Sequence, residues 1–124
     1  MTKTYRIIHV KKNKTKRNNK KYCMDVEFGD KNENARLIGY PCHGGPNQKF
    51  RHNKKTKQLV AKHSRKCLEN IVALGRIYQQ KCDPVKKTQK WMRKKGKWVS
   101  VFDKKSIGSE KNIDCNIRPL VTTK

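Results

Sequence analysis

The chain has 124 residues, enough for one ordinary domain and too few for two. Hydrophobic residues make up 33% of the sequence and aromatic residues 7%, so the chain can bury one modest core. Its 33 Lys and Arg residues outnumber 9 Asp and Glu residues, and a formal net charge of +24 favours polyanions as partners: nucleic acid, anionic glycans or an acidic membrane surface.

In chain order, the sequence reads as short strands in close succession. Apolar bursts are separated by connections rich in Gly, Pro, Asn, Asp or Lys, which is typical of an all-β domain. The expected strands are 4–10, 21–28, 35–40, 48–51, 58–61, 66–71, 76–81, 89–93, 98–102 and 112–117. Nowhere does a helical periodicity of 3.6 residues persist over a helix length, so we expect an all-β fold.

A motif recurs within this series of strands. "YCMDVEF…LIGYPCHGGPNQKF" is echoed by "KCLENI…RIYQQKCDPVKKTQKW". The matched pairs lie 44, 40, 41 and 41 residues apart: Cys23 and Cys67, Cys42 and Cys82, Gln48 and Gln89, and Phe50 and Trp91.

Three units of about 40 residues with about four strands each would fill the chain, and three units suit a β-trefoil, because a propeller needs at least four blades. The repeat therefore predicts a single β-trefoil domain in which Phe50 and Trp91 are buried at equivalent positions. The expected lobes are about 1–54, 55–95 and 96–124.

These motifs resemble the ricin-type β-trefoil lectins, whose lobes carry a Q-x-W signature. The resemblance rests on C-x-D-V, an aromatic-Pro-Cys and N-Q-x-(F/W), and it covers residues 21–93. The third lobe lacks both a Q-x-W and a second cysteine pair, so we expect it to be degenerate. In that lobe "GKWVSVF" would be one strand and "NIDCNIRPL" the closing one.

The resemblance also implies a sugar site. In this family a lobe binds sugar through an Asp on its second strand, an aromatic residue near the end of the third, and an Asn or Gln before Q-x-W. Asp25, Tyr40 and Asn47 occupy these places. Their carboxylate, ring face and carboxamide suit neighbouring hydroxyls and the C–H side of a sugar ring. Gln48 would support Asn47 or the backbone, and His43 is a further candidate contact. Asp25 could instead serve the fold as an acceptor for backbone N–H groups.

Two departures from the family pattern change this expectation. Ile38 stands two residues before Tyr40, at a position that is often polar in the family, so one hydrogen bond to the sugar is expected to be missing. In the second lobe, Glu69, Gln80 and Thr88 replace the Asp, the aromatic residue and the Asn. Without an aromatic platform, we expect no sugar there.

Five cysteines bear on the compartment. The resemblance pairs Cys23 with Cys42 and Cys67 with Cys82, as disulfides after export or as buried thiols in a reducing cytosol. Cys115 is left over and is expected to be buried on the closing strand. The N-terminal stretch "MTKTYRIIHVKK" has no apolar run long enough for a signal peptide, and no later stretch could span a bilayer, so the localisation stays open.

Motifs for metal binding and catalysis are missing from the sequence. It contains no C-x-x-C, H-E-x-x-H, phosphate loop or nucleophile elbow. "DKNEN" at 30–34 resembles the start of a calcium loop, but Ala35 and Pro41 stand where that loop needs Gly and Glu. We therefore expect no metal, no cofactor and no enzymatic activity.

The basic residues form clusters, the densest between the first two strands. Seven of eleven residues in 11–21 are Lys or Arg, and they are the candidate polyanion-binding residues: Lys11, Lys12, Lys14, Lys16, Arg17, Lys20 and Lys21. Such a surface is either a solvated coat or a salt-sensitive binder of polyanions. The few aromatic residues occupy mostly core-like positions, so sequence-specific reading of nucleic acid is not expected.

The sequence thus supports two functions of different classes. The first is a non-enzymatic lectin-like module with one galactose-type sugar site in the first lobe. The alternative is a basic trefoil that binds nucleic acid or sulfated glycans by charge, as a structural component of a larger assembly. The two differ in their response to salt and to competing sugar.

Overall fold

The computed structural model describes residues 4–10, 21–109 and 118–123 as short strands joined by turns. The strands are β1 (Arg6–Ile7), β2 (His9–Val10), β3 (Tyr22–Val26), β4 (Ala35–Pro41), β5 (Lys49–His52), β6 (Leu59–Ala61), β7 (Cys67–Ile71), β8 (Arg76–Gln80), β9 (Trp91–Lys94), β10 (Lys97–Ser100), β11 (Ser106–Ser109) and β12 (Arg118–Thr123). Three single 3-10 turns complete the described elements: η1 (Glu27–Gly29), η2 (Pro46–Gln48) and η3 (Lys87–Gln89).

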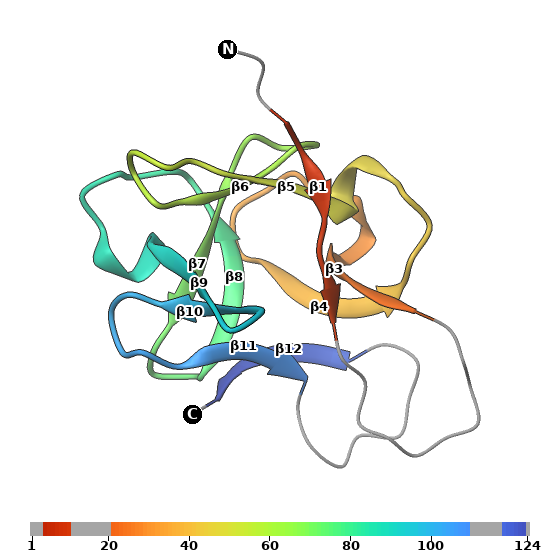
Figure 1. Ribbon diagram of the computed structural model, residues 1–124. Coiled ribbons are helices and arrows are strands. Elements are labelled where there is room, and N and C mark those ends of the chain that lie inside the picture. The colour runs from red at the N-terminus through yellow and green to blue at the C-terminus, as the bar shows by residue number, and fades with distance from the viewer. Residues whose placement is uncertain (1–3, 11–20, 110–117, 124) are drawn as a thin grey trace.

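Three antiparallel hairpins organise the fold (Figure 1). They are β3–β4, β7–β8 and β11–β12. The second strands of these hairpins also pair with one another, since β4 pairs with β8 and with β12, and β8 pairs with β12. The connecting strands pair as β5 with β6 and β9 with β10. This threefold arrangement is the all-β architecture that the sequence repeat predicts.

Strand register places the repeated residues at equivalent points of the first two hairpins. In β3–β4, Cys23 stands opposite Tyr40. In β7–β8, Cys67 stands opposite Gln80. Likewise Asp25 faces Ile38, as Glu69 faces Tyr78. Residues matched by sequence spacing are therefore matched in space as well.

The core lies where the hairpins meet the connecting strands. It is built from residues of all three hairpins and of β5, β6 and β9. Phe50 and Trp91 are 2% and 0% exposed, as expected from the repeat, and Trp91 Nε1 donates a hydrogen bond to the Leu68 carbonyl at 3.0 Å. An aromatic ring after each Q-x thus fills the core behind its own hairpin.

Near the N-terminus, the structure differs from the expected strand at 4–10. Two strands are found there, and they pair with different partners: β1 with β5 and β2 with β3. Between them, the Ile8 carbonyl accepts a hydrogen bond from the Met24 N–H at 2.9 Å. The segment changes neighbours at Ile8, and hydrophobic alternation alone does not reveal such a change.

The third hairpin was only partly expected from the sequence. The end of the expected closing strand "NIDCNIRPL" falls in β12, whereas β11 was not expected. Strand β11 reads Ser-Ile-Gly-Ser, which is too polar to stand out, and the expected strand at 112–117 lies outside the described residues together with Cys115. The proposed lobe boundaries and the degeneracy of the third lobe stay predictions.

Two disulfides brace the first two hairpins. Cys23 is bonded to Cys42, and Cys67 is bonded to Cys82. Each links the start of one hairpin strand to the segment that follows the other, and both are compatible with an extracellular location. Across the described residues, no helix has the length and apolar character needed to cross a membrane.

Candidate functional site

A hollow of about 310 Å³ opens beside the first hairpin. Its walls come from β3, β4, the η1 turn and the loop that leads into β5. The lining residues are Asp25, Glu27, Phe28, Gly29, Ile38, Tyr40, His43 and Asn47. Four of the five residues selected from the sequence therefore line one cavity. The fifth, Gln48, is fully buried next to Asp25.

Gln48 holds the loop of residues 41–48 in shape. Its Oε1 accepts hydrogen bonds from the N–H groups of His43 and Gly44, at 2.8 and 3.2 Å. Its Nε2 donates to Asp25 Oδ2 at 2.8 Å and to the Pro41 carbonyl at 3.1 Å. A side chain with both a donor and an acceptor is needed to make these four bonds. The Gln of the repeated motif is thus a positioning residue for the site.

Asp25 is the centre of a set of donors. Asn47 Nδ2 donates to its Oδ1 at 3.1 Å, Gln48 Nε2 donates to its Oδ2, and His43 Nε2 lies 3.5 Å from Oδ2. Asn47 Nδ2 also donates to the Val26 carbonyl at 3.0 Å. These partners suit an ionised carboxylate, which has about four acceptor positions. The two hydrogen bonds and the contact with His43 thus use three of these positions.

Burial raises the pKa of Asp25 above its ordinary value of 3.8, although the hydrogen bond from Gln48 and the charge of His43 oppose the rise. We expect the Asp25 carboxyl to titrate above pH 3.8, because only 2% of the residue is exposed. The folded state then holds this proton more tightly than the unfolded state. Stability from this group is therefore lost as the pH rises from 3.8 through the raised pKa.

Carboxyl carbon shifts, followed by NMR as a function of pH, would measure this pKa directly. A midpoint at or below 3.8 would show that the hydrogen bonds outweigh burial, and the sign of the pH effect on stability would then be reversed.

His43 and Tyr40 form one side of the hollow. Their rings meet edge to face, with centroids 5.9 Å apart and planes at 71°. His43 Nδ1 accepts a hydrogen bond from the Gly45 N–H at 3.0 Å, so in the neutral ring the proton sits on Nε2, toward Asp25. A Cβ on Gly45 would lie only 2.8 Å from His43 Cε1, which explains the glycine. His43 thus supports both Tyr40 and Asp25.

The second hairpin repeats the supporting bonds of the first. Gln89 Nε2 donates to Glu69 Oε1 at 3.0 Å and to the Lys81 carbonyl at 2.9 Å, and its Oε1 accepts from the Asp83 N–H at 2.9 Å. Glu69 also forms an ion pair with Lys86, whose Nζ lies 3.3 Å from Glu69 Oε2. Gln89 is therefore the structural equivalent of Gln48.

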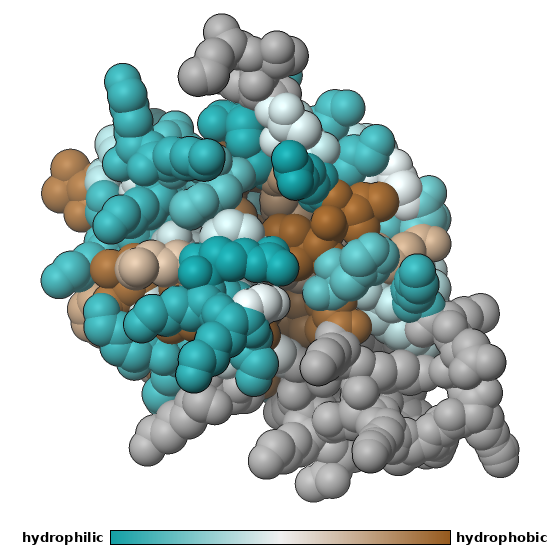
Figure 2. All heavy atoms as spheres, viewed as in Figure 1, coloured by the Kyte–Doolittle hydropathy of each residue, from teal (hydrophilic) through white to brown (hydrophobic). Residues whose placement is uncertain are grey.

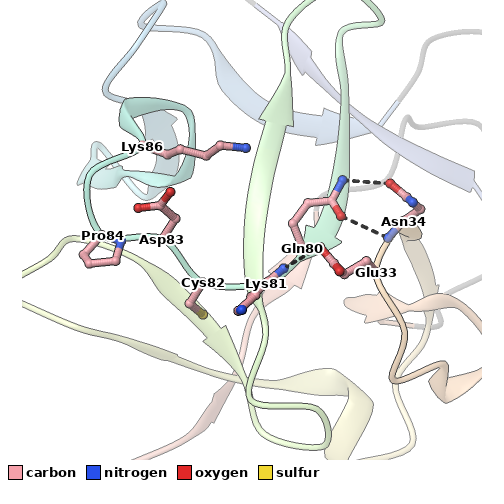
Figure 3. Close-up of a pocket in the computed structure, with 8 residues that line it drawn as sticks. All are labelled: Glu33, Asn34, Gln80, Lys81, Cys82, Asp83, Pro84 and Lys86. Atoms are coloured by element: carbon pink, nitrogen blue, oxygen red, sulfur yellow. Dashed lines mark hydrogen bonds between the residues drawn. The ribbon is translucent and has the colours of Figure 1, made fainter.

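The hollow beside the second hairpin differs in its lining from the hollow beside the first. A hollow of about 630 Å³ is lined there by Glu33, Asn34, Gln80, Lys81, Cys82, Asp83, Pro84 and Lys86 (Figure 3). Gln80, at the place of Tyr40, donates to Asn34 Oδ1 at 2.9 Å and accepts from the Asn34 N–H at 3.1 Å. None of the described residues that line this hollow is aromatic. It offers no flat apolar face.

Three lining residues of the first hollow escaped the sequence analysis: Glu27, Phe28 and Gly29. Glu27 pairs with Arg36 through two contacts of 2.6 and 2.9 Å. Phe28 was assigned to the end of a strand, but it lies in the η1 turn. The Gly29-Asp30 pair that follows Phe28 was the available signal of a turn.

One group of side chains has the composition of a metal site. His9, Cys23 and Cys42 offer ligand atoms that lie within 4.8 Å of one another. However, the two sulfurs are joined in a disulfide, and the thiolate is the form of cysteine that binds metal. Only the imidazole is left as a ligand in this state.

Most of the candidate polyanion-binding residues fall outside the described part of the chain. These are Lys11, Lys12, Lys14, Lys16, Arg17 and Lys20. Lys21, the last of the set, is described and is exposed.

Comparison with known proteins identifies the family and the fold. The model of the ricin-type beta-trefoil lectin domain matches residues 3–91. No curated protein matches the chain in sequence. Solved structures match over most of the chain at low identity, and this likeness shows that the fold is a β-trefoil.

Three of these structures illustrate the range of sequence identity and structural similarity. The designed threefold-symmetric protein ThreeFoil has 23% identity and a TM-score of 0.72, with 83% of this chain and 81% of that chain covered. The C-half of the earthworm R-type lectin, in complex with GalNAc, has 15% identity and a TM-score of 0.71, with 83% and 80% covered. The Vibrio vulnificus hemolysin/cytolysin β-trefoil lectin, with N-acetyl-D-lactosamine bound, has 21% identity and a TM-score of 0.64, with 86% and 87% covered.

Proposed function

Because the chain belongs to the ricin-type beta-trefoil lectin family, we propose that it binds a galactose-type sugar in the hollow beside its first hairpin. The chain is a lectin-like β-trefoil. The sugar it binds, the place where it binds and its lack of enzymatic activity are parts of the proposal. Two similar structures hold GalNAc and N-acetyl-D-lactosamine, which both contain a galactose-type ring.

The main support for this proposal is that a carboxylate, an aromatic ring and a carboxamide lie around one cavity. Asp25 presents a carboxylate that Asn47 and Gln48 hold in position, and Tyr40 is a half-buried ring on the same cavity. A sugar hydroxyl donates to the carboxylate, while the C–H face of the sugar ring packs on the tyrosine. The apolar Ile38 beside them cannot add a hydrogen bond.

One shallow site of this kind binds weakly, so useful affinity requires several copies or several glycans together. The two disulfides favour an extracellular role for the proposed lectin. Among the lining residues that the structure describes, Asp25 accepts from amide donors and His43 is oriented by Gly45, which supports the proposal of a binding module.

We expect Tyr40→Ala to weaken galactose binding at least tenfold, because the sugar would lose its apolar platform; tenfold corresponds to about 1.4 kcal/mol. NMR titration of the labelled protein with galactose would measure the dissociation constant. Gln80→Ala is the matched control, since Gln80 occupies the same register position in the second hairpin and should leave galactose binding unchanged. Equal effects of the two substitutions would reject the assignment of the first hollow.

The charge of the chain supports a second candidate function. Figure 2 shows a face that is mainly hydrophilic, with hydrophobic side chains gathered near its middle. The exposed lysines of the described residues are Lys21, Lys31, Lys54, Lys55, Lys57, Lys62, Lys81, Lys86, Lys87, Lys94, Lys95, Lys97 and Lys104. With a net charge of +24, this surface would bind sulfated glycans or nucleic acid through released counterions.

Titration at two salt concentrations separates the two functions. Galactose is uncharged, so its binding should not depend on salt, whereas binding of heparin or DNA should weaken steeply. If Tyr40→Ala leaves heparin binding intact while abolishing galactose binding, the two activities use different surfaces.

A further inference from the structure

Phe28 occupies an unusual place for a large aromatic side chain. Its side chain is 92% exposed, the largest exposed fraction among the exposed large hydrophobic residues of the described chain. It therefore contributes almost nothing to the core. In the second hairpin, the residue at the same distance after the acidic residue is Val72, which is smaller and 44% exposed.

The backbone at Phe28 is strained as well. Its φ is +62° and the next residue, Gly29, has the same value. Glycine adopts this left-handed conformation freely, but for a bulky residue it is an outlier. Phenylalanine is thus unfavourable here for both its backbone and its side chain, and strained residues of this type cluster at ligand-binding sites.

The position of the turn connects Phe28 to the proposed sugar site. A Cβ placed on Gly29 would lie 3.9 Å from Asn47 Cγ, and Asn47 donates to the Val26 carbonyl just before the turn. Phe28 lines the same hollow as Asp25 and Ile38, both of which are 2% exposed. The floor of the hollow is therefore buried, whereas Phe28 stands at its rim.

We propose that Phe28 is a ligand-binding residue and that the site recognises a glycan of at least two rings. This inference rests on the proposed function of the same hollow. The inner galactose-type ring contacts Asp25, Asn47 and Tyr40. The next ring extends past the rim and packs its C–H face on Phe28, which supplies a second aromatic surface.

The proposal predicts opposite effects of one substitution on binding and on stability. Phe28→Gly removes the ring and relaxes the backbone, since glycine accepts a φ of +62°. Binding of lactose should weaken about two- to tenfold, the value of one aromatic contact. Binding of galactose alone should weaken less than binding of lactose, because Phe28 stands at the rim of the hollow, and the melting temperature should not fall. A substitution that harmed only the fold would lower all three.

Two further variants complete the test. Phe28→Tyr keeps a ring at the rim and, unlike Phe28→Gly, should retain the preference for lactose over galactose. Val72→Ala, at the equivalent turn of the second hairpin, should change neither affinity. Isothermal titration with galactose and lactose, and thermal unfolding, would be measured on each protein.

The outcomes separate this inference from the proposed function. If Tyr40→Ala abolishes galactose binding but Phe28→Gly leaves lactose binding unchanged, only the role of Phe28 is wrong. An equal loss of galactose and lactose binding in Phe28→Gly would also overturn it, because Phe28 would then contact the inner ring or shape the hollow. If the parent protein binds neither sugar, both proposals fail.

Discussion

Replacing Trp91 by alanine should lower the free energy of unfolding by about 3–5 kcal/mol, the usual cost of removing a large buried aromatic side chain. Trp91 is 0% exposed and packs in the main core cluster. The substitution also leaves the Leu68 carbonyl without its indole donor. Since small domains have a total stability of about 5–15 kcal/mol, this one change would remove a large share of it. Urea unfolding followed by circular dichroism would measure the loss.

Two substitutions serve as controls for Trp91→Ala. Trp91→Phe should cost much less, because the equivalent position in the first lobe holds Phe50 and a phenyl ring refills most of the space. Phe102→Ala removes an aromatic ring that is 50% exposed, and surface changes of this kind usually stay within about 0.5 kcal/mol. If Trp91→Ala cost no more than Phe102→Ala, the repeat would not place a core residue at Trp91.

The fold could be predicted because the repeated residues make equivalent interactions at equivalent positions of the first two lobes. Gln48 and Gln89 each donate to an acidic side chain and to a backbone carbonyl, and each accepts from at least one backbone N–H. Such a set of bonds requires one residue type at one spacing, so it leaves a visible trace in the sequence. The aromatic residue two positions later then falls inside the core by strand alternation.

Features that depend on tertiary pairing were not predictable in the same way. The strand expected at 4–10 changes partners at Ile8, and β11 is stabilised by its neighbours although its own sequence is polar. Phe28 was expected to be the last residue of the strand at 21–28, but it lies in the η1 turn. The Gly29-Asp30 pair indicates a turn close by, but it does not indicate that Phe28 itself adopts a left-handed backbone.

The sequence left open whether Asp25 serves the fold or a ligand. In the structure, the hydrogen bonds of Asp25 bear on both roles. The expected structural role was to accept backbone N–H groups. In the structure the donors are the side chains of Asn47 and Gln48, with His43 nearby. Because two of these three partners line the hollow, the bonds that stabilise the loop also fix the groups that would face a sugar.

Asp25→Asn should therefore reduce stability and sugar binding together. The amide NH₂ of the new residue would face a donor, either on Asn47 or on Gln48. Neither partner can turn its own amide, since Asn47 Nδ2 is also bonded to Val26 and Gln48 is bonded to Pro41, His43 and Gly44. A lost hydrogen bond to a charged group costs about 1.5–3 kcal/mol, so we expect a loss of stability of this size. Part of it is offset because a buried charge is removed.

Sugar affinity should fall more than tenfold in the same variant, because the ligand hydroxyl loses a charged acceptor and about 1.4 kcal/mol is tenfold. Glu69→Gln is the matched control. Glu69 accepts from Gln89 as Asp25 accepts from Gln48, so its loss should lower stability without changing galactose binding. Urea unfolding and NMR titration with galactose would be measured on both variants. Full galactose affinity in Asp25→Asn would mean that the carboxylate serves only the fold, and the basic surface would then be the better candidate for the function.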